Sequence, residues 1–508
     1  MKAARRIFTS WHEPLLIAIC AAILSAQLFV PPFIGLADNG DFPKVTGRLS
    51  LGPRDGGENF IHFVSDYLLS PRYYWKSETL STELPLAWLA TRLSRTTKEG
   101  DAFDIRWLGA IHAVLLLAAL YILIRSLRPL PPWPRLLIAA AAIFIFTDVH
   151  YVSYFNSFYT DAAALLGLLL MVALAVLIAI TGMRIGNAIL FCLAALLFIG
   201  SKPPHAIWGF LPAAFIALAG RRRGLPFAST LLAASALTLW LSPATYSAAP
   251  LFTLVFSKLT RQNPAPQEVL AQLGLPPEDS AFIGMNAYVP KAPILDPKWL
   301  SDFTRETSYR AVLNWYFHHP ARAIEFLEQT LTIEAPQMRA LNLSNFRRQD
   351  APTHGWRAGH FAVWTDLRSA LLRKWPYHML VWYLFVVAAS ILMIVRTQQA
   401  LLGWLTLGIA ALGIGEFCVA ALADAAETHR HLFIFHACTD LTICCGIGFS
   451  LFVRPSIISI QCLHAAWRRY LQCPERLGPR YHHQESGSRW LRGGRTADRP
   501  QPRCRNLP

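Results

Sequence analysis

Apolar runs of about 14 to 24 residues recur along most of this 508-residue chain, and they limit its fold more strongly than any other feature. A run of about 20 apolar residues crosses a bilayer as a helix, because a helix satisfies its own backbone hydrogen bonds where lipid offers none. Hydrophobic residues make up 54% of the chain and charged residues only 15%. The sequence therefore predicts an all-α, polytopic integral membrane protein.

We expect about ten transmembrane helices. The candidate spans are residues 14–34, 105–125, 135–150, 160–180, 187–201, 205–220, 225–244, 378–395, 400–422 and 432–453. The third and fifth spans are short, and short spans can tilt, thin the bilayer or rest on neighbouring helices. The number of spans is therefore approximate.

The orientation follows from the positions of the basic residues, because short connections rich in Lys and Arg stay in the cytoplasm. With the amino-terminal "MKAARR" inside, the cytoplasmic connections are "RSLRPLPPWPR", "TGMRIG", "RRRG" and "VRTQQ", which are all basic. The opposite side receives most of the acidic residues. We therefore expect both termini in the cytoplasm and an extracytoplasmic acidic face.

The predicted spans divide the chain into four regions. These are an N-terminal transmembrane module, 1–244, with a first external loop at 35–104; an extracytoplasmic helical insert, 245–377; a C-terminal transmembrane module, 378–453; and a basic tail, 454–508. The tail contributes much of the net charge of +16. We expect it to be disordered, cytoplasmic and attracted to anionic lipid. No motif that reads nucleic acid accompanies its charge.

Ionisable and polar side chains gather at the external ends of the predicted spans, in four separate connections. They are Asp38 and Asp41 after the first span, Asp148, Asn156, Tyr159 and Asp161 after the third, Lys202 after the fifth, and Glu427, His429 and Arg430 after the ninth. A charge near the bilayer is costly unless it faces water, a partner or a site. Four such connections on one face therefore predict a functional site.

Each of these groups also has a structural interpretation. Asp38 or Asp41 could cap a turn in "DNGD", a composition that favours turns. Asp161 opens the fourth span and could complement the dipole of that helix. The motif "ETHRH" could be a local ion-paired connection. The histidines lack HExxH or another strong zinc spacing, so the sequence does not favour a structural zinc site.

The layout resembles the GT-C glycosyltransferases, which have an acid in the first external loop, a second acidic site after the third span, and a helical external insert. More narrowly, "ADNGDFPKV", "YFNSFYTD" and "ETHRHLFIF" resemble bacterial membrane proteins of surface-glycan biosynthesis, of the WsfD-like hexose transferase type. The resemblance covers most of residues 14–453. It implies an inverting hexosyltransferase of the bacterial inner membrane that uses a polyprenyl-phosphate sugar and a glycan acceptor on the extracytoplasmic face.

The resemblance also implies a catalytic base. In the GT-C superfamily the acid of the first loop takes this role, and Asp41 in the "GD" pair matches it best, with Asp38 as the alternative. The usual twin "DE" or "DD" pairs are missing, which leaves open whether a divalent cation such as Mg or Mn is used. The candidate ligands of such a cation are Asp38 and Asp148.

The remaining candidates suit the other needs of glycosyl transfer. The departing lipid phosphate needs cations or hydrogen-bond donors, and the bidentate fork of an arginine suits a phosphate well. The candidate residues for this role are Arg430, His429 and Lys202, and those for positioning substrate are Asp148, Asn156, Tyr159 and Glu427. No P-loop or Rossmann fingerprint for a soluble nucleotide sugar is found in the sequence.

Two other functions could use the same external charges. A transporter or flippase of lipid-linked glycans would line a pathway with them, but apart from Glu416 the centres of the spans are nearly free of ionisable residues. A glycan polymerase or ligase would rest on external arginines without an acidic base. The effect of removing the Asp41 carboxylate separates these functions from the transferase.

Overall fold

The structure is a computed structural model, and by their internal contacts residues 1–451 form one compact unit. The residues that it describes are 2–54, 62–75, 80–95, 101–339, 343–350, 356–397 and 399–452. The predicted basic tail lies outside these described residues, so its disorder and its location stay predictions.

Each of the predicted spans coincides with a helix in the described part of the chain. These helices are α1 (Lys2–Leu28), α4 (Arg106–Ser126), α5 (Pro132–Phe146), α7 (Asp161–Thr181), α8 (Ile185–Ile199), α10 (Phe210–Gly220), α11 (Leu225–Trp240), α18 (His378–Arg396), α19 (Ala400–Leu422) and α21 (Phe433–Phe452). By length and composition, α4, α7, α18 and α19 are able to cross a membrane. The others are shorter or less completely described, so the number of about ten spans stays a prediction.

The boundaries of several spans differ from the prediction. α10 begins at Phe210 where the predicted span began at residue 205, and α11 ends at Trp240 where the predicted span ended at residue 244. α1 ends at Leu28, before the Pro31-Pro32 pair, because a residue that precedes proline disfavours the helical region. The predicted first span continued to residue 34. α5 begins at Pro132 and ends at Phe146, earlier than the predicted 135–150, because proline is well suited to the first turn of a helix.

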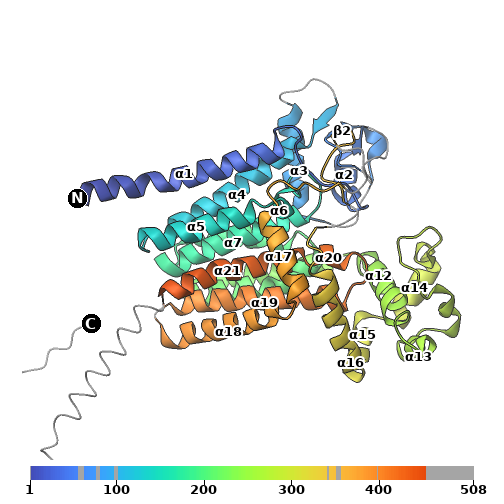
Figure 1. Ribbon diagram of the computed structural model, residues 1–508. Coiled ribbons are helices and arrows are strands. Elements are labelled where there is room, and N and C mark those ends of the chain that lie inside the picture. The colour runs from blue at the N-terminus through green and yellow to red at the C-terminus, as the bar shows by residue number, and fades with distance from the viewer. Residues whose placement is uncertain are drawn as a thin grey trace, which may run out of the picture. The chain divides into compact units, whose positions relative to one another are not determined.

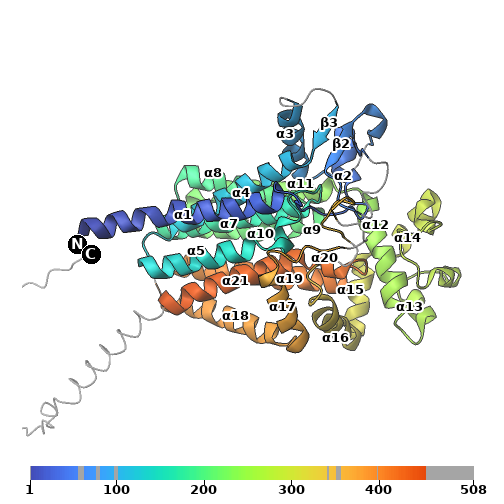
Figure 2. The ribbon, with the colours of Figure 1, turned by 45° about the horizontal axis from the view of Figure 1, so that its top comes forward.

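The long helices run side by side. Figures 1 and 2 show α1, α4, α5, α7, α18, α19 and α21 alongside one another, with α2, α3, α6 and α20 at one end of the bundle. We call this end the polar end. α7 is buried over most of its length and packs against α4 and α8. A Cβ on Gly167 would lie 2.5 Å from the backbone nitrogen of Phe198, so glycine allows α7 and α8 to approach closely.

Arginines lie in the connections at the opposite end of the bundle. They are Arg125 and Arg128 between α4 and α5, Arg184 between α7 and α8, Arg221–Arg223 between α10 and α11, and Arg396 before α19. This arrangement follows from the alternating direction of the helices. The basic connections therefore share one end of the bundle, and the side of the membrane that this end faces stays a prediction.

A small sheet covers part of the polar end, so the prediction of an all-α protein is wrong in this detail. Its strands are β1 (Leu51–Pro53), β2 (Asp66–Leu69) and β3 (Ala102–Asp104), antiparallel in the order β1-β2-β3, with Leu51 opposite Leu69 and Asp66 opposite Asp104. The ring of Tyr67 packs edge-on against Phe158, 5.0 Å away between centroids. Strands of three or four residues are too short to show a recognisable alternation in the sequence.

Several shorter helices and 3-10 turns lie in the connections between the long helices. The helices at the polar end are α2 (Pro43–Thr46), α3 (Glu83–Arg95), α6 (Val149–Val152), α9 (Pro203–Ala206) and α20 (Thr428–His431). The 3-10 turns lie at Gly47–Leu49, Pro71–Tyr73, Ile207–Gly209 and Arg221–Arg223. The last of these turns lies at the opposite end, with the arginine-rich connections. α2 and α9 begin with proline at the first helical position, where its missing N–H is not needed.

The segment 245–377 is largely helical in its described residues. It contains α12 (Ala244–Thr253), a π-helix (Leu254–Leu259), α13 (Pro266–Gln272), α14 (Pro297–Glu306), α15 (Tyr309–His318), α16 (Pro320–Gln329), a second π-helix (Thr330–Glu334) and α17 (Val363–Lys374), with 3-10 turns at Pro277–Phe282 and Pro293–Leu295. Phe252, Phe256, Trp299 and Phe303 make an aromatic core for it. The predicted division into modules stays a prediction.

Candidate functional site

The backbone between α1 and α2 is held by the segment that follows the second π-helix. The N–H groups of Gly35 and Ala37 donate to the carbonyl oxygens of Asn345 (3.1 Å) and Ser344 (2.9 Å). The side chain of Asn345 donates in return from Nδ2 to the carbonyl oxygen of Gly35 at 3.0 Å. The acids that follow therefore lie on a backbone fixed by these hydrogen bonds.

Asp38 caps the turn that follows. Its Oδ1 accepts hydrogen bonds from the N–H groups of Gly40 (2.8 Å) and Phe42 (3.1 Å), and its side chain is buried. Gly40 has φ +103°, in the left-handed region that favours glycine. Burial raises the pKa of Asp38 to about 6, although the N–H groups act to lower it. Asp38 therefore caps the turn in "DNGD", which is the structural interpretation considered from the sequence.

Asp41 pairs with cations on both of its oxygens. Oδ1 forms an ion pair with Lys44 at the start of α2, and Oδ2 lies 2.9 Å from Nη1 of Arg430. The side chain remains 23% exposed. Burial acts to raise the pKa of Asp41, but the positive charges of Arg430 and Lys44 outweigh it and hold the pKa well below its usual range. Asp41 is therefore an ionised carboxylate that solvent can reach.

Arg430 connects α20 to three acidic side chains. Besides Asp41, its Nη1 lies 3.7 Å from Oδ2 of Asp161, and its Nε donates to Oε2 of Glu427 at 3.0 Å. The guanidinium lies 5.3 Å from the ring centre of Tyr159, within cation–π range. Its side chain is only 7% exposed. A buried arginine surrounded by carboxylates stays charged.

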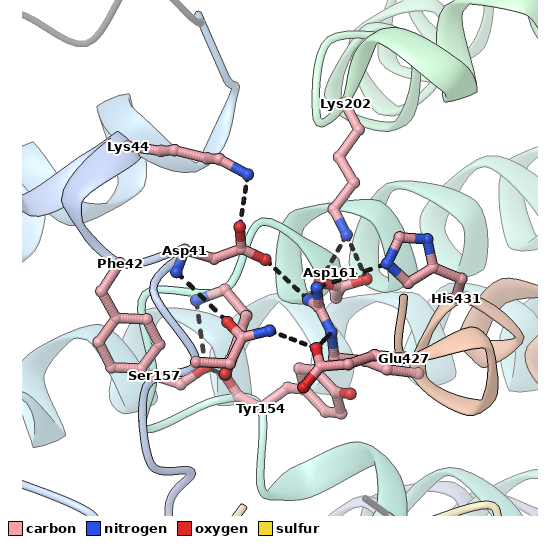
Figure 3. Close-up of polar contacts among 12 residues, drawn as sticks. Asp41, Phe42, Lys44, Tyr154, Ser157, Asp161, Lys202, Glu427 and His431 are labelled. Atoms are coloured by element: carbon pink, nitrogen blue, oxygen red, sulfur yellow. Dashed lines mark hydrogen bonds and ion pairs between the residues drawn. The ribbon is translucent and has the colours of Figure 1, made fainter. Parts of the chain in front are cut away.

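Lys202 fixes the position of Asp161. Its Nζ donates to both carboxylate oxygens of Asp161, at 2.8 Å each (Figure 3). Asp161 is the first residue of α7, and Lys202 directly precedes α9. The negative charge of Asp161 lies at the start of α7, where it complements the helix dipole, which is one of the two roles considered from the sequence. Asp161 also forms ion pairs with Lys202 and Arg430.

A second set of contacts holds the connections together. Asn39 Nδ2 donates to Oε2 of Glu427, which links the loop after α1 to the residue before α20. The hydroxyl of Tyr159 donates to the carbonyl oxygen of Ala37 at 3.0 Å. Glu427 has φ +51°, an uncommon conformation for a residue with a side chain. This backbone conformation lets Glu427 face both Asn39 and Arg430.

The structure thus brings together side chains from all four connections that the sequence singled out. We use the term ion-pair cluster for six of them: Asp41, Lys44, Asp161, Lys202, Glu427 and Arg430. Tyr159 lies against it, and Asp38 lies two residues before Gly40, in the same turn as Asp41. The grouping could not be read from the spacing of these residues, because the contacts are long-range.

Asp148 belongs to a different set of contacts. Its Oδ1 accepts from the N–H of His150 at 2.9 Å and from the hydroxyl of Thr365, and its Oδ2 accepts from the N–H of Thr365 at 3.1 Å. Burial raises the pKa of Asp148, while these hydrogen bonds act to lower it. In this structure Asp148 caps α6 and joins it to α17, which does not favour the expected role in orienting substrate.

Asn156 and His429 also have partners outside the ion-pair cluster. Asn156 is fully buried, and its Nδ2 donates to the carbonyl oxygens of Leu28 (3.1 Å) and Ile34 (2.8 Å). Nδ1 of His429 lies 3.6 Å from a carboxylate oxygen of Glu334. Asn156 therefore supports the loop after α1 from behind, and His429 faces the second π-helix rather than Arg430.

The acidic candidates do not converge on a cation position. Among the described residues there is no group of three or more His, Cys, Asp and Glu side chains that could hold a metal ion. The carboxylate of Asp38 accepts N–H groups of its own turn, and that of Asp148 accepts the hydroxyl of Thr365. The expected pair of ligands therefore does not fit a divalent cation in this arrangement, and we derive no step through one.

Sequence reasoning missed two groups that the cluster contains or contacts. Lys44 lies three residues after Asp41, a spacing that places both on one side of the first turn, so the motif itself could have revealed it. Tyr246 on α12 has the Nζ of Lys44 5.5 Å from its ring centre. No local signal pointed to Tyr246, because the contact depends on how α12 packs at the polar end.

Comparison with known families identifies the membrane region. Residues 2–459 match the family model described as "YfdI N-terminal transmembrane domain". The chain belongs to this family. Together with its long apolar helices, this membership shows that the protein is an integral membrane protein. A comparison with curated protein sequences gave no match.

One solved structure similar to this member of the family is an oligosaccharyltransferase from Archaeoglobus fulgidus in the apo form. The sequence identity is 12% and the TM-score 0.38, and the alignment covers 89% of this chain and 52% of that chain. The chain thus spans about half the length of the oligosaccharyltransferase. At this identity and TM-score the likeness carries no conclusion about the chemistry, which rests on the ion-pair cluster.

Proposed function

We propose that the protein is a GT-C-type membrane glycosyltransferase that moves a sugar from a polyprenyl-phosphate donor to a glycan or lipid-linked acceptor. The observation that carries the proposal is the contact between Asp41 and Arg430. It places an accessible carboxylate beside a buried guanidinium, at the end of a bundle of apolar helices. A carboxylate that accepts a proton and a cation that binds a phosphate are the two groups this reaction needs.

The reaction is an inverting displacement at the anomeric carbon. The acceptor hydroxyl oxygen forms a bond to this carbon while its proton passes to the carboxylate of Asp41. The bond between the anomeric carbon and the phosphate oxygen breaks, and the lipid phosphate departs with the electron pair. Arg430 stabilises the charge of the departing phosphate, and Lys202 adds a second positive charge 2.8 Å from Asp161.

Asp41 is the better candidate for the base, and Asp38 the alternative. Asp41 is 23% exposed, whereas Asp38 is buried and uses Oδ1 to hold the N–H groups of Gly40 and Phe42. A base must come within hydrogen-bond reach of the acceptor hydroxyl. In favour of Asp38, its pKa of about 6 lies closer to neutral pH than the lowered pKa of Asp41.

The polar end is assigned to the extracytoplasmic side. The opposite end carries the arginine-rich connections, and such connections stay in the cytoplasm. A donor available on the extracytoplasmic side of a bacterial inner membrane has to be carried by a lipid. A polyprenyl chain could lie against the apolar helices while its phosphate reaches the ion-pair cluster.

The test begins with the substrate. We expect a strain that lacks the protein to accumulate a lipid-linked sugar, which mass spectrometry of its lipid extract would identify. Purified Asp41→Asn, assayed with that donor and a matched acceptor, should lose at least about 100-fold in turnover, the scale that a general base contributes. Asp38→Asn should lose less. Asp302→Asn, which changes an exposed carboxylate paired with Arg305 on α14, is the matched control and should keep full activity.

The same variants separate the alternative functions. Unchanged transfer in Asp41→Asn, together with loss in variants of the cluster's cations, would support a polymerase or ligase that uses no acidic base. If Asp38 is indispensable and Asp41 is not, the base is Asp38 and the transferase proposal stands. If the purified protein moves the accumulated lipid across vesicle membranes but transfers no sugar, it is a transporter and the proposal is wrong.

A further inference from the structure

The ion-pair cluster is electrically balanced, which restricts how it can bind an anion. It contains three carboxylates, on Asp41, Asp161 and Glu427, and three cations, on Lys44, Lys202 and Arg430. Each cation already faces at least one carboxylate. An incoming phosphate therefore cannot simply add to the site, because it would meet as much negative as positive charge. It has to replace one of the carboxylates on a cation.

The guanidinium of Arg430 has an atom that is suited to such a replacement. Nη1 makes ion-pair contacts with Asp41 and Asp161 but has no hydrogen-bond partner in the described structure. The side chain is more than nine-tenths buried. A buried N–H group without a hydrogen bond costs free energy, so an oxyanion placed in line with it would bind favourably.

Of the three carboxylates around Arg430, Asp41 is the one that can leave. Asp161 is held through both of its oxygens by Lys202 at 2.8 Å. Glu427 lies on the same turn as Arg430 and accepts a hydrogen bond from Nε and another from Asn39. Asp41 keeps a second cation, Lys44, when it loses the contact with Arg430. It is also the most exposed of the residues that touch Nη1.

We propose that the donor phosphate binds by exchange, in which a phosphate oxygen takes the place of the Asp41 carboxylate on Nη1 of Arg430 and Asp41 remains paired with Lys44. This inference rests on the proposed function and adds an order of events to it. Asp161 and Glu427 act as positioning residues, because they keep the guanidinium in place during the exchange. The ligand recognised at Nη1 is a phosphate monoester or diester oxygen.

The exchange would couple donor binding to the activation of the base. While Arg430 contacts Asp41, the carboxylate is a weak proton acceptor, because the guanidinium charge stabilises its ionised form. When the phosphate takes over that contact, Asp41 becomes more basic. The acceptor hydroxyl would then be deprotonated only after the donor is in place, which ties the base to the presence of its substrate.

The experiment is a double-mutant cycle on phosphate binding, with the purified full chain in detergent and farnesyl phosphate as the probe. Exchange predicts that Asp41→Asn binds farnesyl phosphate about tenfold more tightly than the unchanged protein, because the competing carboxylate is gone. Arg430→Gln should bind it at least about tenfold more weakly. In the double variant the gain from Asp41→Asn should disappear, since the competition takes place on Arg430.

A control separates exchange from general electrostatics. Asp424 lies in the connection before α20 and pairs with Nδ1 of His431 at 2.9 Å. The other ring nitrogen of His431 lies 3.5 Å from Nη2 of Arg430, so Asp424 contacts Arg430 through His431 and does not contact Nη1. Asp424→Asn removes a nearby buried negative charge without freeing Nη1 of Arg430, so its gain in affinity for farnesyl phosphate should be smaller than that of Asp41→Asn. If Asp424→Asn tightens binding as much as Asp41→Asn does, or if the gain persists in the double variant, the exchange is wrong.

The outcome for the exchange can be told apart from the outcome for the proposed function. If Asp41→Asn abolishes sugar transfer but leaves the affinity for farnesyl phosphate unchanged, the transferase stands and the exchange is refuted. If the binding cycle behaves as expected but the purified protein transfers no sugar from the accumulated lipid, the phosphate site stands and the transferase is refuted. Circular dichroism of each variant shows whether it is folded.

Discussion

Arg430 Nη1 lies 2.9 Å from Oδ2 of Asp41, although the two residues lie far apart in the sequence. Asp41 follows α1, the first helix of the bundle, and Arg430 precedes α21, the last. This contact joins the two outermost of the connections that the sequence singled out. Asp161 and Lys202 come from the other two connections, and Asp161 lies 3.7 Å from the same Nη1 atom of Arg430. The ion-pair cluster therefore depends on the packing of the whole bundle, because its residues come from four connections that lie far apart in the sequence.

The planar fork of Arg430 should be essential. Arg430→Lys keeps the positive charge, but one ammonium cannot reproduce the separate contacts of Nε with Glu427 and of Nη1 with Asp41. We expect kcat/KM for the lipid-linked donor to fall by at least about tenfold, the size of one lost charge-assisted hydrogen bond. Arg305→Lys on α14 is the matched control. Full transfer by Arg430→Lys at limiting donor would make Arg430 a structural ion-pair residue.

The turn cap at Asp38 should give a pH-dependent contribution to stability. Its pKa in the folded protein, about 6, lies above the value of about 3.9 for an unfolded chain, so the folded protein binds more protons between these values. The contribution of Asp38 to the free energy of unfolding is therefore greatest below pH ~4 and decreases as the pH rises to about 6.

Asp38→Asn removes this titration but keeps an oxygen that can accept the two N–H groups. Thermal unfolding in detergent, followed from pH 4 to 7, should show the melting temperature of the unchanged protein falling relative to that of Asp38→Asn over this interval. A constant difference between the two proteins would show that the Asp38 carboxyl does not titrate in this range.

Asp148 should matter for stability and not directly for the chemistry. It accepts hydrogen bonds from both the N–H and the hydroxyl of Thr365, which join α6 to α17. Asp148→Asn should lower the free energy of unfolding by about 1–3 kcal/mol, the usual cost of a disturbed buried hydrogen bond. Thr365→Val should give a non-additive effect with it in a double-mutant cycle measured by thermal unfolding. Normal stability together with lost sugar transfer would return Asp148 to the site.

The orientation of the bundle can be tested with reporter fusions. Gly224 lies in the arginine-rich connection before α11, and Pro264 lies between the first π-helix and α13. A fusion at Gly224 should report the cytoplasm and one at Pro264 the extracytoplasmic side, because α11 separates them. The same location for both reporters would contradict the assignment of the polar end to the outside.

The sequence by itself predicted the class of the protein. The length of its apolar runs determined where helices form, because a segment in lipid has to satisfy its own backbone hydrogen bonds. The basic connections and the four polar ones could also be placed at opposite ends, since spans alternate in direction. For this reason Asp41, Lys202 and Arg430 could be predicted to share one end.

Only the tertiary structure decided which of these side chains meet. Asp38 and Asp41 are alike in the sequence, but the left-handed turn at Gly40 directs Asp38 to its own backbone, and Asp41 contacts Arg430. The sequence predicted Asp148 as a site residue, and in the structure its carboxylate accepts hydrogen bonds from Thr365, which lies far along the chain. The periodicity of the sequence also did not predict the short strands or the contact between Tyr246 and Lys44. Such contacts depend on how distant segments pack, and local spacing does not encode that packing.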